Sequence, residues 1–330
     1  MAGGLCGAVP ARAAVINGHG YQPLADWADA HGFHTVARHG DEIVLAGHGS
    51  RLVFDKDSHM AQINGVNVAL SFPVAADKGQ FFIASLDLAK TVGPLVFAPG
   101  FAGRRIYTIC LDPGHGGRDP GNRVGWHSEK NYTLPLAFEL RRQLEAAGFK
   151  VILTRTKDAY VDLDARPALA NRYHANLFLS LHFNATETGR AEVEGPETYC
   201  ITPVGTASSN SQGAGARYGR TPANADERQS LLLAYQVQKA LVNNLGADDR
   251  GVRRARFAVL RDAQMPAILV ESGYMTHPVE GKKIFTAAYR KQIAAAITKG
   301  ILAYQQLTAP AVGKTVTATP KRSRHPRNVK

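Results

Sequence analysis

From about residue 105 onward, short apolar runs alternate with longer stretches in which apolar residues recur at helical spacing. The runs consist mainly of β-branched and other apolar residues and stop at turns, which predicts buried strands at residues 106–111, 151–153, 177–181 and 267–270. Helical spacing predicts four helices: one that begins just after Glu129, and three that cover residues 163–173, 228–245 and 283–307. This alternation predicts an α/β fold, with a mostly parallel twisted sheet and helices on both faces.

The first of these helices shows how the core is expected to form. We expect Asn131 to cap it and Gly148 to end it. Its apolar stripe is predicted to pack on the sheet and consists of Leu134, Phe138, Leu140, Leu144 and Ala147.

Residues 15–95 follow a different pattern, with short strands and one or two helices. The triplet Ile-Asn-Gly occurs at 16–18 and again at 63–65, and Asn-Gly favours tight hairpin turns. This echo predicts a small α/β unit built from two similar halves. Residues 96–104, with Pro99-Gly100 near the middle, are expected to link this unit to a domain at residues 105–308.

Three of the predicted strands are followed by residues that can bind a metal or move a proton. The run at 106–111 leads into a Pro/Gly turn with His115, the run at 177–181 leads to His182, and the run at 267–270 leads to Glu271. In open α/β sheets the carboxyl ends of the strands form the binding edge, so these residues are expected to converge. Taken alone, the turn around His115 is compatible with a plain turn as well as with a metal ligand.

Glu129 is the fourth candidate. A glutamate before a helix commonly complements the positive helix end, but two histidines at strand ends favour a ligand role. His127 is a competing ligand, or a residue that supports one. Two imidazoles and one carboxylate suit Zn²⁺, which keeps a further position for water in catalytic sites, and Glu271 is then free to act as the base.

Five motifs in this order carry a family resemblance. LDPGHGG (111–117), SEKN (128–131), TRTKD (154–158), SLHFNA (180–185) and MPAILVESGYMTHP (265–278) resemble the zinc-dependent N-acetylmuramoyl-L-alanine amidases, the type 3 amidases of bacterial cell walls. The resemblance implies Zn²⁺ on His115, Glu129 and His182, with Glu271 as the catalytic carboxylate. The implied reaction is hydrolysis of the peptidoglycan amide between the lactyl group of N-acetylmuramic acid and L-alanine.

Some positions depart from the family pattern. Phe183 stands where a small residue is usual, Ser272 where an apolar residue is common, and His277 where asparagine is frequent. These departures bear on how the substrate fits. Residues 15–95 resemble the small amino-terminal domain of copper amine oxidases, which implies an accessory or wall-targeting role.

Composition adds a broad class and a compartment. The chain has 330 residues, of which 45% are hydrophobic and 20% charged, a globular composition with room for two domains. It contains no apolar stretch of membrane-spanning length. Residues 1–14 resemble the end of a secretory signal, so we expect a periplasmic or extracellular protein, and a monomer.

Two polar segments are expected to be flexible. Residues 203–227 are rich in Gly, Ser, Ala and Asn and predict a surface loop that leaves the zinc site open, whereas some members of the family have an inserted helix there. In this loop Arg217, Tyr218 and Arg220 either contact stem-peptide carboxylates or are solvated.

The tail at 309–330 carries six Lys and Arg residues and no acid, within a net charge of +12. It is expected to be disordered and to favour polyanions, without a specific nucleic-acid motif.

Two other functions fit parts of the pattern. A non-catalytic wall-binding module would keep the fold without the chemistry, but all four site positions hold competent residues. A metallo-amidohydrolase or peptidase acting on a small soluble substrate would use the same site.

Overall fold

The computed structural model describes residues 14–97, 105–209 and 219–309. Nearly all of the signal-like segment, most of the expected linker and nearly all of the basic tail therefore lie outside the described residues. Arg217 and Tyr218 lie outside them as well.

The amino-terminal region contains two antiparallel sheets and short helices. One sheet has the strand order β1-β2-β9-β8, and strands β3 to β7 follow one another as a meander. Its elements are β1 (Ala14–Ile16), β2 (His19–Pro23), α1 (Leu24–Ala30), β3 (His34–His39), β4 (Glu42–Gly47), β5 (Ser50–Asp55), β6 (Met60–Ile63), β7 (Val66–Ala69), β8 (Ala75–Asp77), β9 (Gln80–Ala84), α2 (Ser85–Asp87), the π-helix η1 (Leu88–Val92) and α3 (Gly93–Val96).

Both expected Asn-Gly hairpin turns are confirmed. Asn17 and Gly18 join β1 to β2 with φ of 50° and 79°, and Asn64 and Gly65 join β6 to β7 with the same values. Positive φ at both central residues matches the twist of the flanking strands, and glycine and asparagine adopt it at low cost.

The remainder of the chain forms the α/β part predicted from residue 105 onward. Strands β13, β10, β14 and β17 are parallel, β15 runs antiparallel to β17, and β16 is parallel to β15. The elements are β10 (Thr108–Pro113), β11 (Arg123–Val124), β12 (His127–Ser128), α4 (Lys130–Ala146), β13 (Lys150–Leu153), α5 (Ala165–Arg172), β14 (Leu177–Asn184), β15 (Glu197–Cys200), the 3₁₀-helix η2 (Pro222–Ala225), α6 (Glu227–Leu245), β16 (Val252–Arg254), α7 (Ala258–Arg261), β17 (Ala267–Tyr274), α8 (Glu280–Ile284) and α9 (Ala287–Thr308).

Side chains of the central strands alternate between two cores. Leu179 and Leu181 of β14 pack with α4, α6 and α9, whereas Phe178, the residue before Leu179, packs with α5 and α7 on the other face. Because successive side chains of a strand point to opposite faces, a continuous apolar run fits a sheet covered on both sides. The expected helices on both faces are confirmed.

Two helix predictions need correction. Asn131 lies inside α4 and does not cap it, and the buried face of α4 includes Leu136, Leu140 and Leu144, while Phe138 is 41% exposed. The expected helix at 283–307 is two helices, α8 and α9. Thr286 separates them because its side chain accepts a hydrogen bond from the backbone N–H of Tyr289 and so starts α9.

The sheet does not stop at the boundary between the two regions. Val68 of β7 pairs with Val252 of β16, so strands β7 to β3 continue the sheet into eleven strands. The Asp249 carboxylate accepts a hydrogen bond from the Asn67 backbone N–H (2.6 Å), and the buried Tyr235 hydroxyl of α6 donates to the Ile63 carbonyl (2.9 Å). The sheet is therefore mixed over its whole width, and mostly parallel only in the α/β part.

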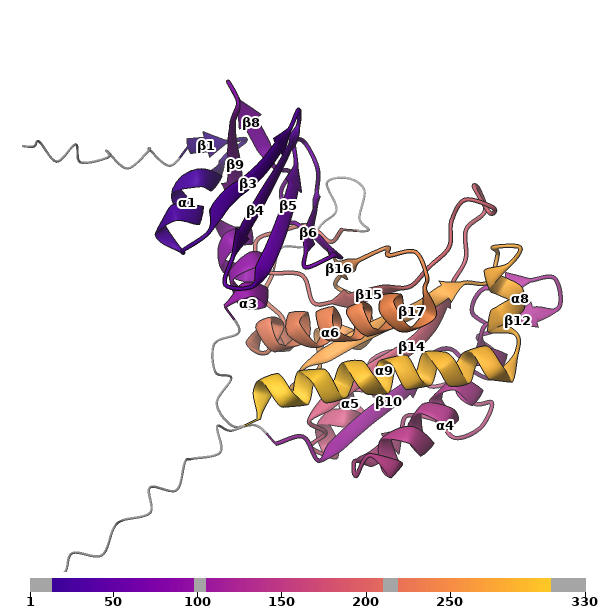
Figure 1. Cartoon of the computed structure of the whole chain (residues 1–330). Coiled ribbons are helices and arrows are strands. Elements are labelled where there is room, and N and C mark those ends of the chain that lie inside the picture. The colour runs from indigo at the N-terminus through magenta and orange to yellow at the C-terminus, as the bar shows by residue number, and fades with distance from the viewer. Residues whose placement is uncertain (1–13, 98–104, 210–218, 310–330) are drawn as a thin grey trace, which may run out of the picture.

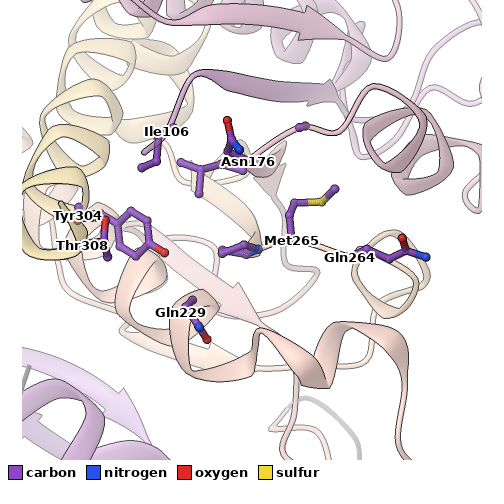
Figure 2. A pocket seen from close by; sticks show the side chains of 10 residues that line it. Ile106, Asn176, Gln229, Gln264, Met265, Tyr304 and Thr308 are labelled. Atoms are coloured by element: carbon purple, nitrogen blue, oxygen red, sulfur yellow. Dashed lines mark hydrogen bonds between the residues drawn. The ribbon is translucent and has the colours of Figure 1, made fainter. Parts of the chain in front are cut away.

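A cavity of about 410 Å³ lies at the amino ends of the parallel strands. Gln229 of α6 and Tyr304 and Thr308 of α9 line it together with Asn176 and Met265 (Figure 2). This is the edge of the sheet opposite to the one that carries His182 and Glu271. The cavity is thus separate from the candidate site.

Candidate metal centre

The three parallel strands β10, β14 and β17 bring the predicted site residues to one edge. His182 of β14 and Glu271 of β17 are register partners on neighbouring strands. They continue the side-chain rows of Phe178 and Leu269, on the face that α5 and α7 cover farther back. His115 follows β10 by two residues, so all three reach the edge from adjacent strands.

His115 has an unusual backbone conformation. Its φ is +61°, in the left-handed region that a histidine seldom adopts, and Gly116 and Gly117 after it are also at positive φ. Such strain persists only where the surroundings hold it. Here the Arg166 guanidinium donates a hydrogen bond to the His115 carbonyl (3.1 Å), which fixes the turn.

A buried ionic network anchors that guanidinium. Arg166 is 1% exposed and donates to Asp112, which is fully buried, at 2.8 Å. Asp112 also accepts hydrogen bonds from Ser180 (2.7 Å) and Thr154 (2.5 Å). Each strand end is thereby tied to its neighbour, and the loop with His115 starts from a fixed point.

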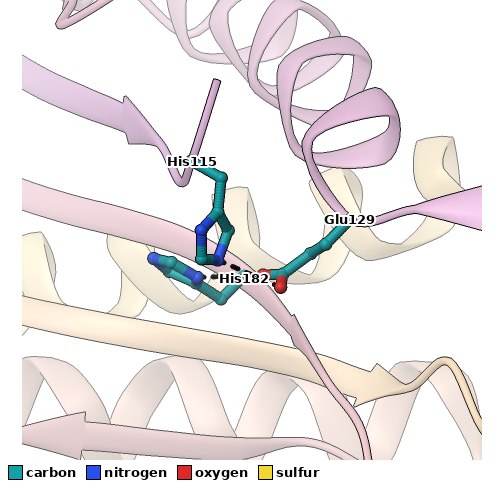
Figure 3. A group of neighbouring side chains, drawn as sticks. All are labelled: His115, Glu129 and His182. Atoms are coloured by element: carbon teal, nitrogen blue, oxygen red, sulfur yellow. Dashed lines mark hydrogen bonds and ion pairs between the residues drawn. The ribbon is translucent and has the colours of Figure 1, made fainter. Parts of the chain in front are cut away.

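His115, Glu129 and His182 come together as a cluster whose ligand atoms lie within 4.8 Å of one another (Figure 3). The distance from His115 Nε2 to Glu129 Oε2 is 3.0 Å, and from His182 Nδ1 to Glu129 Oε1 it is 2.9 Å. The two imidazole rings are nearly perpendicular, at 84°. Both histidines thus direct a nitrogen to one carboxylate.

Hydrogen bonds around the cluster orient its members. The Glu129 carboxylate accepts hydrogen bonds from the backbone N–H groups of Asn122 (2.9 Å) and Phe183 (3.0 Å). His115 Nδ1 lies 2.8 Å from Asp119 Oδ2, which leaves Nε2 for the cluster. A carboxylate behind a ligating histidine is the common arrangement around protein metal ions.

The electrostatics favour a cation at this point. Burial raises the pKa of Glu129, but hydrogen bonds from His115 and His182 outweigh it and hold that pKa far below its usual range. Burial lowers the pKa of His115, whereas its contacts with Glu129 and Asp119 raise it, and the net shift is upward. The Glu129 carboxylate therefore stays ionised and attracts positive charge, whether a proton on a neighbouring imidazole or a metal ion.

Two glycines leave the space that the cluster occupies. A Cβ on Gly114 would lie 2.3 Å from the His182 ring, and a Cβ on Gly121 would lie 2.6 Å from Glu129 Oε2. Two imidazole nitrogens and a carboxylate oxygen form a donor set typical of catalytic zinc, with positions left for water or substrate. The residues present fit a divalent ion of this kind.

Glu271 lies beside the cluster and is differently placed. The residue as a whole is partly exposed, but its Oε2 atom is buried and has no hydrogen-bond partner among the described residues. Burial raises its pKa well above the usual range, and the negative charges of Glu129 and Glu197 raise it further. A carboxyl group with a raised pKa can take up and release a proton near neutral pH.

Glu197 is a neighbour that the motifs did not indicate. It is the register partner of Glu271 on β15 and forms an ion pair with Arg253 (2.7 Å). It follows a loop and is the first residue of a strand of only four residues, so its position beside Glu271 depends on an antiparallel pairing that the sequence pattern does not mark.

His127 is not part of the cluster. Its ring stacks on that of Phe285, with centroids 3.7 Å apart, and it forms a hydrogen bond with the Tyr132 hydroxyl. The expectation that it competes with Glu129 as a ligand is therefore not supported. Arg220 is exposed.

Comparisons with known proteins agree on the α/β part. The family model described as N-acetylmuramoyl-L-alanine amidase matches residues 109–303. The amidase AmiC of Neisseria meningitidis is 32% identical over 240 residues, covering 66% of this chain and 57% of that protein. LytC of Bacillus subtilis, also an N-acetylmuramoyl-L-alanine amidase, is 34% identical over 197 residues, covering 60% of this chain and 35% of that protein.

A solved structure extends the likeness to three dimensions. The amidase AmiC2 of Nostoc punctiforme is 34% identical, has a TM-score of 0.51, and covers 61% of this chain and 97% of its own. The chain matches little more than half the length of AmiC and about a third of LytC. Since the family model covers more than half of the sequence, the chain belongs to the N-acetylmuramoyl-L-alanine amidase family.

Proposed function

We propose that this protein is a zinc-dependent N-acetylmuramoyl-L-alanine amidase that hydrolyses the amide between N-acetylmuramic acid and L-alanine in peptidoglycan. The observation that carries the proposal is the cluster of His115, Glu129 and His182, with Glu271 in register beside it. The likeness to proteins named as such amidases supports the choice of bond.

In this proposal His115, Glu129 and His182 hold Zn²⁺. When bound, the ion acts as a Lewis acid that polarises a carbonyl group and makes water more acidic. The protein keeps the three ligands in place through Asp119, the two backbone N–H groups on Glu129 and the turn fixed by Arg166. Such preorganisation is what a catalytic centre requires.

Glu271 is the proton carrier. Its Oε2 atom is uncommitted, so it can accept the proton of the attacking water. It then returns that proton to the nitrogen of the departing L-alanine, since an amine leaves only when protonated. Both proton transfers use the same carboxyl group, whose raised pKa allows it to release a proton as well as to accept one.

The setting of the enzyme follows from its substrate. Peptidoglycan lies outside the cytoplasmic membrane, so the protein acts in the periplasm or outside the cell. None of the helices in the described part of the chain is both long and apolar enough to cross a membrane. We assign residues 15–95 an accessory role and the basic tail contact with polyanions of the envelope, and we take the protein as a monomer.

Digestion of purified sacculi, with and without a chelator, tests the proposal. We expect new L-alanine amino ends and free lactyl groups, identified by mass spectrometry, only without chelator. The Glu271→Gln variant is the matched control and should release neither. If sacculi remained intact while small soluble amides were cleaved, the substrate would be wrong. If neither were cleaved by zinc-loaded protein, a non-catalytic wall-binding role would replace the proposal.

A further inference from the structure

A short hairpin connects the metal cluster with a strongly exposed tryptophan. Strands β11 and β12 pair Arg123 with Ser128 and Val124 with His127. At the base of the hairpin the Glu129 N–H donates to the Asn122 carbonyl (2.9 Å), and the Asn122 N–H donates to the Glu129 carboxylate. Trp126 precedes Glu129 by three residues, on the order of 10 Å of extended chain.

Trp126 is 83% exposed, more than any other large hydrophobic side chain in the described part of the chain. A single exposed apolar residue needs no special explanation by itself. This one is held in place, however, because its ring packs against that of His127, with centroids 3.6 Å apart and 32° between the planes. His127 in turn stacks on Phe285, at 8° between the planes.

The stack draws its members from three separate elements. Trp126 and His127 belong to the hairpin, Phe285 directly follows α8, and Tyr132 of α4 packs against Phe285 at 4.8 Å. Figure 1 shows β12 beside α8 at the end of the molecule away from strands β3 to β5. An aromatic ring fixed in this way loses little freedom when a ligand settles on it.

We propose that Trp126 is the platform of a glycan-binding subsite, on which the apolar face of a pyranose ring of the substrate strand stacks. The inference rests on the proposed function, because the amide to be cut hangs from a sugar of a glycan strand. A sugar held near Glu129 places its linked neighbours within reach of the indole, because the backbone of Trp126 lies no more than about 10 Å of chain from that of Glu129. The ring has no charge and offers a broad flat surface, which suits a neutral sugar face.

The tryptophan content of the chain provides a direct probe. Trp27 and Trp126 are the only two tryptophans, and Trp27 is 6% exposed. A ligand that covers the indole of Trp126 removes it from water, so its fluorescence emission should shift to the blue. The full-length Glu271→Gln variant is titrated with peptide-free oligosaccharides of alternating N-acetylglucosamine and N-acetylmuramic acid, which the enzyme has no bond to cut.

We expect a saturable blue shift that is absent in Glu271→Gln/Trp126→Ala, together with a loss of affinity of roughly three- to tenfold by calorimetry. Trp126→Phe, which keeps a smaller ring, should retain part of that affinity. Tyr107→Ala, which removes another exposed aromatic ring (60% exposed) at the far edge of the sheet, is the control and should bind as the parent does.

Three results would overturn the inference. They are no spectral change with the oligosaccharides, equal affinity in the Trp126→Ala variant, and a blue shift with phosphatidylglycerol vesicles but not with sugars, which would assign Trp126 to a lipid surface. Because the titration needs no catalysis, it separates this inference from the proposed function. Sacculi left intact by the wild-type enzyme would end the latter, while a normal titration would still support the subsite.

Discussion

His182 and Glu271 are partners in the parallel register of β14 and β17, so a histidine of the metal cluster and the uncommitted carboxyl group emerge from adjacent strands on one face. Neither side chain needs a loop to reach the other. This pairing makes the distance between the proposed metal ligand and the proposed proton carrier a property of the sheet, and variants of the two residues should therefore leave the fold intact.

Glu271→Gln should abolish hydrolysis and preserve metal binding. The amide has nearly the same shape as the carboxyl group but cannot carry a proton, so a loss of about 10²–10⁴-fold or more in kcat is expected. Metal content is measured by elemental analysis and activity by release of L-alanine ends. Retention of substantial activity would show that another group acts as the base.

The same residue should govern the pH dependence of stability in chelated protein. The pKa of Glu271 is raised in the folded state, so the folded chain binds more protons and its free energy of unfolding falls as pH rises above about 4.5. Glu271→Gln should therefore melt at a higher temperature than the parent at pH 7 and at an equal one near pH 4. Thermal melts across this range check the sign.

Glu139 offers a control of opposite sign. The Arg142 guanidinium beside it lowers its pKa to about 2, so its contribution to stability is present above about pH 4.5 and is lost as pH falls toward 2. Glu139→Gln should be slightly destabilising at pH 7, because an ion pair near the surface contributes little. If both variants shifted in the same direction, the assignment of these pKa shifts would be wrong.

Metal removal should inactivate the enzyme reversibly. Chelation followed by added Zn²⁺ should restore activity, and the melting temperature should rise with zinc because an ion that binds only the folded state stabilises it. His115→Ala should lose the metal. His127→Ala should keep its metal, since this ring packs on Phe285 outside the cluster. Equal metal loss in both variants would contradict the ligand assignment.

Removal of the Arg166 side chain should damage the site from a distance. Arg166→Met leaves Asp112 charged, buried and without its cation, which is expected to cost about 3–5 kcal/mol of unfolding free energy. Since the His115 carbonyl also loses its donor, zinc affinity should fall by about 10–100-fold.

Urea denaturation and competition with a zinc chelator measure the two effects. The double variant Asp112→Asn/Arg166→Met removes both charges and should recover part of the stability but not the affinity. If Arg166→Met alone left the zinc affinity unchanged, the Asp112 network would not be what positions His115.

Tyr235→Phe tests the junction between the two parts of the chain. It removes the donor to the buried Ile63 carbonyl and should cost about 1–3 kcal/mol. Because the sheet is continuous, Trp27 fluorescence, measured with Trp126→Phe in both proteins, and far-ultraviolet circular dichroism should report one coincident urea transition with and without Tyr235→Phe. Two separated transitions would mean that the regions unfold independently.

How far the sequence predicts this structure depends on the range of the interactions. His182 and Glu271 could be located because each directly follows an apolar run, and His115 because it lies in the turn that ends one; parallel strands place such ends together. The convergence of Glu129 required the motif as well. The pairing of Val68 with Val252 joins two strands whose residues are 184 positions apart in the sequence. No local pattern indicates that the edge strand of one sheet pairs with the edge strand of the other.

The errors in the helices have equally physical causes. Helical spacing correctly indicated Leu140 as a core residue of α4, but it also proposed Phe138, whereas the packing of α4 on the sheet and α9 buries Leu136 instead. The hydrogen-bond network around Asp112 could not be predicted from the sequence, because its partners come from three other segments of the chain. A buried charge is recognised only when the groups that neutralise it are seen together.

The pairing of Val68 with Val252, reinforced by the contact of Asn67 with Asp249, joins the amino-terminal part to the rest through the backbone of the sheet. If the amino-terminal part binds the cell wall, that attachment would then also set the orientation of the candidate site relative to the glycan strand. Such an enzyme would approach its substrate in one preferred orientation, set by the backbone pairing between the two parts.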